Sequence, residues 1–216
     1  GVDTDIWNPA GDPLIPRRFS GRSLGARAGN RRALEKAFGL DQDDAPFFII
    51  VSRLTWQKGM DLMIDAIDHL VGLGGKLALL GSGDQALEGA FLAAADRHHG
   101  RIAARIGYDE PLSHLMQVGG DAILIPSRFE PCGLTQLYGL RYGCLPVVAR
   151  VGGLADTIID ANEAAVSAGA ATGIAFAPSD PLALHGAIAR AIHLHGNRPI
   201  WQAMQRAAMR ANVSWD

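Results

Sequence analysis

Short apolar runs alternate along this chain with longer segments in which apolar residues recur every three or four positions. The run from Pro46 to Val51 is apolar throughout and partly β-branched, which is typical of a strand covered on both faces. Similar runs begin near residues 76, 101, 121, 145 and 173, with segments of helical spacing such as Met60 to Val71 between them. This strict alternation predicts an α/β fold, a doubly wound, parallel Rossmann-like sheet built from right-handed βαβ units.

The remaining segments are expected to be less regular or to lie near the chain ends. Residues 1–22 contain three prolines and several short polar residues, and we expect an ordered but irregular N-terminal segment there. Residues 27–38 are rich in helix formers, whereas residues 162–172 are rich in Ala, Ser and Gly and suggest a surface excursion. Leu182 to Leu194 and Ile200 to Ala211 are predicted as the last two helices.

The amino-acid composition and charge argue against several classes of protein. The chain has 216 residues, of which 48% are hydrophobic and 19% charged, as in a soluble globular domain. A net charge of −2 gives no reason to expect nucleic acid as a partner, and no apolar run approaches the length of a membrane span. Cys132 and Cys144 are too few for a disulfide framework and lack a zinc spacing, which favours a reducing cytoplasm. The histidines have no accompanying carboxylate cluster, so we expect neither a metal nor a cofactor.

In a parallel sheet, ligands bind beyond the carboxyl ends of the strands. Polar residues and glycines follow most of the predicted strands at this edge: Arg53 and Lys58, Ser82 and Asp84, Tyr108, Glu130, and Gly152 and Gly153. We therefore expect the functional site at this edge of the sheet.

The segment after the fourth strand carries one carboxylate beside a helix start. Glu130 lies between an apolar strand and Pro131, where it could stabilise positive charge on a sugar ring or hold a hydroxyl; the alternative is a helix cap. A helix beginning at Gly133 would present its macrodipole to an anion. The backbone N–H groups that would point toward this anion are those of Cys132, Gly133, Leu134 and Thr135. The Cys132 side chain is expected to be packed rather than nucleophilic, because no His lies in an adjoining motif.

The other strand ends offer weaker signals. Arg53 and Lys58 could clamp a diphosphate, or they could be ordinary surface cations of a solvated loop. Gly81 to Asp84 begins like a dinucleotide-binding loop but lacks the third glycine, and a tight turn explains it equally well. Tyr108 could stack on a flat base or be a partly buried aromatic at the edge of the domain.

Several motifs together closely resemble those of the bacterial glycogen synthases, with plant starch synthases as the nearest relatives. The motifs are Ser52 to Gly59, Ile106 to Tyr108, Pro126 to Gly143, Gly152 to Thr157, and Gly1 to Pro9. The resemblance runs along nearly the whole chain, and the long motif around Glu130 is its most specific part.

The resemblance implies one half of a retaining glucosyltransferase of the two-domain GT-B type. Such an enzyme transfers glucose from ADP-glucose to the non-reducing end of an α-1,4-glucan, without a metal. Residues 1–22 would be the interdomain connection, and residues 23–216 the C-terminal, nucleotide-sugar-binding domain, lacking the family's terminal crossover helix. An N-terminal domain outside this chain would supply the acceptor groove, so the isolated chain is expected to be inactive.

The resemblance also implies roles for individual residues. Arg53 and Lys58 would hold the diphosphate and neutralise the leaving ADP, Tyr108 would stack on adenine, and Glu130 would lie at the glucosyl group. The amides from Cys132 to Thr135 would complete the phosphate site. Many retaining relatives have a second Glu eight residues after the first; here that position is Tyr138, which leaves the ribose contact unassigned.

Three alternatives remain open. Another retaining glucosyltransferase of this type could use UDP-glucose, and a non-catalytic module could use the same fold to bind a nucleotide. An NAD-dependent dehydrogenase is the weakest alternative, because the glycine fingerprint is incomplete.

Overall fold

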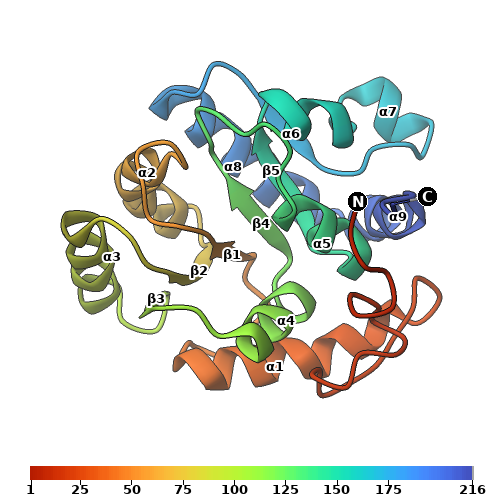
Figure 1. The fold of residues 1–216 in the computed structure, drawn as a ribbon, viewed down its shortest axis with the longest axis horizontal. Helices are drawn as coiled ribbons and strands as arrows, with labels where there is room; N and C mark the ends of the chain where they lie inside the picture. Colours follow the sequence, from red (N-terminus) through yellow and green to blue (C-terminus); the bar gives the residue numbers. More distant parts are fainter. Residues whose placement is uncertain (216) are drawn as a thin grey trace.

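Six strands pair into one all-parallel sheet in the computed structural model, which describes residues 1–215 (Figure 1). The strands are β1 (Phe47–Val51), β2 (Lys76–Gly81), β3 (Ile102–Ile106), β4 (Ala122–Ile125), β5 (Leu145–Ala149) and β6 (Ile174–Phe176). A short 3₁₀ helix, η1 (Leu24–Ala26), precedes the α-helices, which are α1 (Arg27–Phe38), α2 (Met60–Gly72), α3 (Gln85–Arg97), α4 (Glu110–Gly119), α5 (Thr135–Tyr142), α6 (Gly152–Thr157), α7 (Glu163–Ser167), α8 (Pro181–Gly196) and α9 (Arg198–Arg210). The predicted α/β fold with a parallel Rossmann-like sheet is confirmed.

The strand order is β3-β2-β1-β4-β5-β6. The chain therefore moves outward from β1 to β3, crosses back to β4, and then moves outward again to β6. The reversal lies between β1 and β4, which pair directly with Ile49 beside Ile123. The loops that follow these two central strands consequently begin side by side, at the switch point where such sheets bind ligands.

Both faces of the sheet are buried, and this explains why the strands are apolar throughout. Phe48 and Ile50 of β1 belong to an apolar cluster with α2, α3 and α8, whereas Phe47 and Ile49 belong to another with α1 and α4. Alternate residues of a strand point to opposite faces, so each face receives its own layer of helices.

The irregular segments differ in how well they could be predicted. Residues 1–22 form turns without helix or strand, as expected, and they pack through buried side chains such as Trp7 and Phe19 against Tyr142. The stretch 162–172, expected as an excursion only, contains α7. Asn162 caps this helix by accepting a hydrogen bond from Ala165 N, and that cap supports one turn of helix despite its short length.

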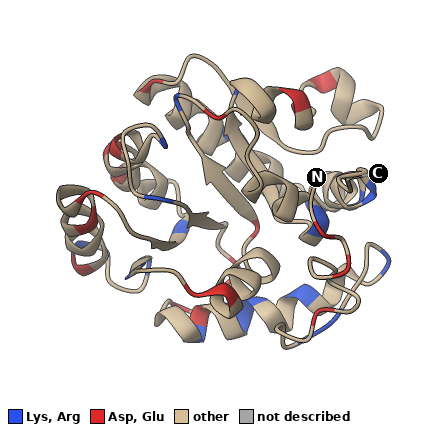
Figure 2. Ribbon diagram, in the orientation of Figure 1, with Lys and Arg blue, Asp and Glu red and all other residues tan. Residues whose placement is uncertain are grey.

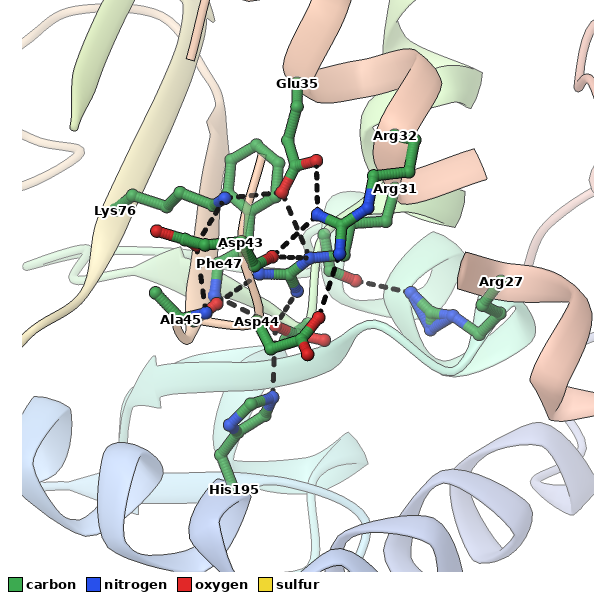
Figure 3. A network of polar contacts seen from close by, with 12 residues as sticks. Arg27, Arg31, Arg32, Glu35, Asp43, Asp44, Ala45, Phe47, Lys76 and His195 are labelled. Carbon is green, nitrogen blue, oxygen red and sulfur yellow. Dashed lines mark hydrogen bonds and ion pairs between the residues drawn. The ribbon is translucent and has the colours of Figure 1, made fainter. Parts of the chain in front are cut away.

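A buried ion cluster holds the amino ends of the central strands. Lys76, the first residue of β2, forms an ion pair with Glu35 of α1, and both side chains are fully buried. Figure 3 shows Glu35 between this lysine and the guanidinium groups of Arg31 and Arg32. Because each buried charge has a partner, the cluster ties α1 to the start of β2 without leaving an uncompensated ion.

Asp121 extends this cluster to β1 and β4. Its carboxylate accepts hydrogen bonds from Arg31 at 2.6 Å and from Phe47 N at 2.9 Å, and His195 Nε2 lies 3.2 Å from it. Burial acts to raise the pKa of the Asp121 carboxyl, but the neighbouring His195 and Arg31 and the hydrogen bond from Phe47 N outweigh it and hold that pKa well below its usual range.

Asp121 should therefore give the fold a specific sensitivity to acid. Because its pKa is lower in the folded state, the ionised Asp121 stabilises the fold above about pH 4, the usual pKa of Asp in an unfolded chain. This stabilisation is lost as the pH falls toward the pKa of Asp121 in the folded state. We expect Asp121→Asn to lower the free energy of unfolding at pH 7 by about 3 kcal/mol. The difference in the free energy of unfolding between the parent and the variant should decrease as the pH is lowered below about 4.

Urea unfolding of the parent and the variant at a series of pH values measures both effects. Asp65→Asn is the matched control, because Asp65 is exposed on α2. If the free energies of unfolding of the parent and Asp121→Asn differ by the same amount at every acidic pH, this role of Asp121 is contradicted.

Candidate functional site

The loops after β1 and β4 are hydrogen-bonded to each other at the carboxyl edge of the sheet. Arg128 N donates to Gln57 O at 2.9 Å, and Gln57 Nε2 donates to Phe129 O at 3.2 Å. Gly59 has a φ of 70°, and a Cβ there would lie 2.0 Å from Pro126 O. Only glycine fits this position, because both its backbone conformation and the close approach of the second loop exclude a side chain.

This packing brings Lys58 and Glu130 together. Lys58 Nζ forms an ion pair with Glu130 Oε2, and Ser127 Oγ donates to the same oxygen at 3.3 Å. The Glu130 residue is only 8% exposed, and Lys58 is half-buried. Neither α5 nor α6, the two helices that start nearby, has a side-chain cap. The carboxylate is thus not a helix cap but is held by a cation and a hydroxyl.

The start of α6, which follows β5, fixes the backbone at Glu130. Gly153 N donates to Glu130 O and to Pro131 O, both at 3.1 Å. Gly152 has a φ of 43°, and a Cβ there would lie 2.1 Å from Glu130 O. The glycine pair noted in the sequence therefore lets the start of α6 lie directly against the carboxylate-bearing turn.

A cavity of about 270 Å³ opens beside the Lys58–Glu130 pair. Its wall includes Arg53, Ser82, Tyr108 and Thr135, which come from four different strand ends or loops. Arg53 is exposed and forms no ion pair within residues 1–215, so its charge is available to a ligand. Tyr108 is 72% exposed, which agrees with a free aromatic face and not with a partly buried one. Thr135 also lines the narrow space next to Glu130, and so joins the cavity to the ion pair.

Trp7 is a cavity residue to which the sequence assigned no role. Its ring stacks between His114, at a centroid distance of 3.9 Å, and Tyr138, at 3.7 Å. His114 Nδ1 lies 2.6 Å from a buried oxygen of Asp12, which fixes the imidazole. Tyr138, left unassigned above, lines the same cavity. A lone Trp in an otherwise polar, irregular segment was the available signal for this position.

The start of α5 differs slightly from the expectation. The helix begins at Thr135, two residues after Gly133, which has a φ of 72°. Gln136 Nε2 donates to Cys132 O at 3.0 Å and to Gly133 O at 3.2 Å, and closes the turn. The four residues proposed for the phosphate cradle therefore form a turn and the first residue of a helix.

Cys132 itself is exposed, so the expectation of a packed side chain was wrong. A Cβ on Gly153 would lie 2.2 Å from Cys132 O, so the backbone of Cys132 packs closely against the start of α6 while its side chain is exposed.

The Gly81 to Asp84 segment is a capped turn. Asp84 accepts hydrogen bonds from Ala86 N at 2.9 Å and Leu87 N at 3.1 Å, and Glu88 accepts one from Gly83 N at 2.8 Å. Side chains of the chain itself thus satisfy part of this helix start, which favours the structural alternative over a dinucleotide loop.

Within residues 1–215, no helix is long and apolar enough to cross a membrane. No three or more His, Cys, Asp or Glu residues in this range group as metal ligands would.

The chain is similar to known proteins along its whole length. The chain is 61% identical to a glycogen synthase from Novosphingobium aromaticivorans and 58% identical to one from Rhizobium johnstonii. Each match covers the whole chain but only 44% and 45% of the relative, so the chain spans less than half the length of these curated relatives.

A solved structure is also similar along the whole chain. This is the catalytic domain of starch synthase IV from Arabidopsis thaliana, bound to ADP and acarbose, with a TM-score of 0.92 and 33% identity over 100% of this chain and 45% of that one. Residues 31–209 match the family described as glycosyl transferases group 1. The chain therefore belongs to the glycosyl transferases group 1.

Proposed function

We propose that this chain is the donor-binding half of a retaining glucosyltransferase that transfers glucose from ADP-glucose to the non-reducing end of an α-1,4-glucan. The observation that carries the proposal is the Lys58–Glu130 pair beside a cavity lined by Arg53 and Tyr108. The names of the two relatives, both glycogen synthases, and the ADP bound to starch synthase IV support it.

The diphosphate of the donor would lie between the two cationic loops and the start of α5. Arg53, which forms no ion pair within residues 1–215, lies at the cavity wall, and Lys58 reaches the adjoining narrow space from the loop two residues before α2. The turn from Cys132 to Thr135 adds backbone N–H groups and the positive end of a helix. These groups together would balance the negative charge of a diphosphate.

The chemical step follows from the charges that develop. The bond between the glucosyl C1 and the diphosphate oxygen breaks, and the electron pair leaves with ADP. Lys58 and Arg53 would stabilise the growing negative charge on that oxygen. The Glu130 carboxylate, buried and held by Ser127, would stabilise the positive charge that develops on the sugar ring. The acceptor oxygen then bonds to C1, and its proton would pass to the departing phosphate oxygen of ADP.

The other parts of the enzyme belong to the proposal as well. Residues 1–22 would connect residues 23–216 to an N-terminal domain that holds the glucan, and closure of the two domains would exclude water. The two free cysteines fit a reducing cytoplasm as the place of action.

The choice of nucleotide is the first test. Tyr108 is exposed at the cavity wall, and a purine offers its ring a larger stacking surface than a pyrimidine. We expect ADP to bind the 216-residue chain at least about tenfold more tightly than UDP, since base stacking contributes about 1–3 kcal/mol. Isothermal titration calorimetry with both nucleotides measures this. Equal or tighter binding of UDP would favour the UDP-glucose alternative.

The cationic clamp is the second test. Replacing Lys58 or Arg53 by Gln should weaken ADP binding about 10- to 100-fold, because a hydrogen bond to a charged group contributes about 1.5–3 kcal/mol. Lys36→Gln is the matched control, because Lys36 is exposed on α1 and remote from the cavity lining. If ADP affinity is the same in all three variants, the phosphate site lies elsewhere.

The role of Glu130 is tested in the full-length protein. We expect Glu130→Gln to lower kcat for glucosyl transfer by about 10²- to 10³-fold, while ADP still binds, because the carboxylate acts on developing charge. Glu163→Gln, at an exposed position of α7, should leave turnover unchanged. Normal turnover of Glu130→Gln would instead support a non-catalytic nucleotide-binding module.

A further inference from the structure

A second and larger cavity lies between the N-terminal segment, α5 and α9. Its volume is about 580 Å³, within the range of small-molecule sites. Four arginines line it, Arg22, Arg141, Arg206 and Arg210, and the lining contains no Asp or Glu. Figure 2 shows basic segments of α5, α9 and the N-terminal loops gathered on one side of the molecule, near the two termini. The cavity shares no lining residue with the one beside Glu130.

The positive charge of this cavity is not compensated by ion pairs within residues 1–215. None of its four arginines forms an ion pair with a carboxylate in the described part of the chain, whereas other arginines, such as Arg31, Arg101 and Arg190, do so. Arg206 and Arg210 lie four residues apart on α9, which places two like charges on one helix face. Such a pair is mildly destabilising unless an anion lies between or beside the guanidinium groups.

One of the arginines is already held in position. Arg141 is half-buried on α5, and its Nε donates to Trp7 O at 3.1 Å while Nη2 reaches Thr4 O at 3.5 Å. These bonds fix the plane of the guanidinium and leave Nη1 without a partner in the described residues. Phe19, which is buried, and Met209 add apolar surface to the same lining. The cavity thus combines a positioned cation, three exposed cations and an apolar wall.

We propose that this cavity binds a phosphorylated small molecule that carries a diphosphate or two phosphate groups. The planar arginine fork matches phosphate oxygens in pairs, and several arginines around one concave space suit more than one phosphate charge. A single orthophosphate would leave most of the space unfilled, so the ligand has an organic body. The net charge of −2 and the confinement of these arginines to a hollow argue against an extended polyanion such as nucleic acid.

The test uses inorganic pyrophosphate as the probe and calorimetry as the measurement. All titrations are made in the chain carrying Arg53→Gln and Lys58→Gln, so that pyrophosphate binding at the proposed donor site is removed. In this background we expect saturable binding that is tighter than that of inorganic phosphate. Adding Arg206→Gln and Arg210→Gln should raise the Kd for pyrophosphate at least tenfold, about 1.4 kcal/mol.

The control separates the cavity from general surface charge. Arg105 lies on β3 and Arg198 at the other end of α9, and both are exposed. Arg105→Gln with Arg198→Gln removes the same total charge and should leave the Kd close to that of the background chain. Thermal unfolding of each variant verifies that all are folded. An absence of saturable binding in the background, or equal weakening by the two pairs of substitutions, would overturn the proposal.

Discussion

The buried charges at the amino ends of β1, β2 and β4 are the interaction on which the rest of the structure depends. Glu35 holds the start of β2 through Lys76, and Asp121 holds the start of β1 through Phe47 N while it directly precedes β4. These strands are only four to six residues long, so fixing where they start also fixes where the loops at their carboxyl ends begin. The edge that carries ions for stability is thus opposite the edge that carries polar groups for chemistry.

Glycines at close contacts between neighbouring segments then hold the Glu130 carboxylate in a fixed position. Gly59 lets the loop after β1 touch Pro126 O, and Gly152 lets the start of α6 touch Glu130 O. Two loops and a helix start therefore meet at Glu130, and its side chain is buried against Lys58 and Ser127. Arg53 and Tyr108, by contrast, remain exposed at the cavity. Many binding sites combine one rigidly held group, which acts on the reacting atoms, with exposed groups around it that bind the rest of the substrate.

The strands and most helices could be predicted because both faces of the sheet are buried, so that local sequence and tertiary environment demand the same residues. The starts of all six strands lie within one residue of the expectation. The errors concern features decided by distant contacts. The backbone of Cys132 packs against Gly153, 21 residues later, and its side chain is exposed. Trp7 lines the cavity because His114 and Tyr138 stack on it, and no local pattern in residues 1–22 contains that information.

Trp7 also connects the two cavities. Its ring lines the one beside Glu130, while its carbonyl oxygen accepts the hydrogen bond from Arg141, which lines the other. The bond to Arg141 therefore holds the backbone of Trp7, whose ring is stacked between His114 and Tyr138. The N-terminal segment is therefore part of the candidate site's framework, and not merely a covering of the sheet.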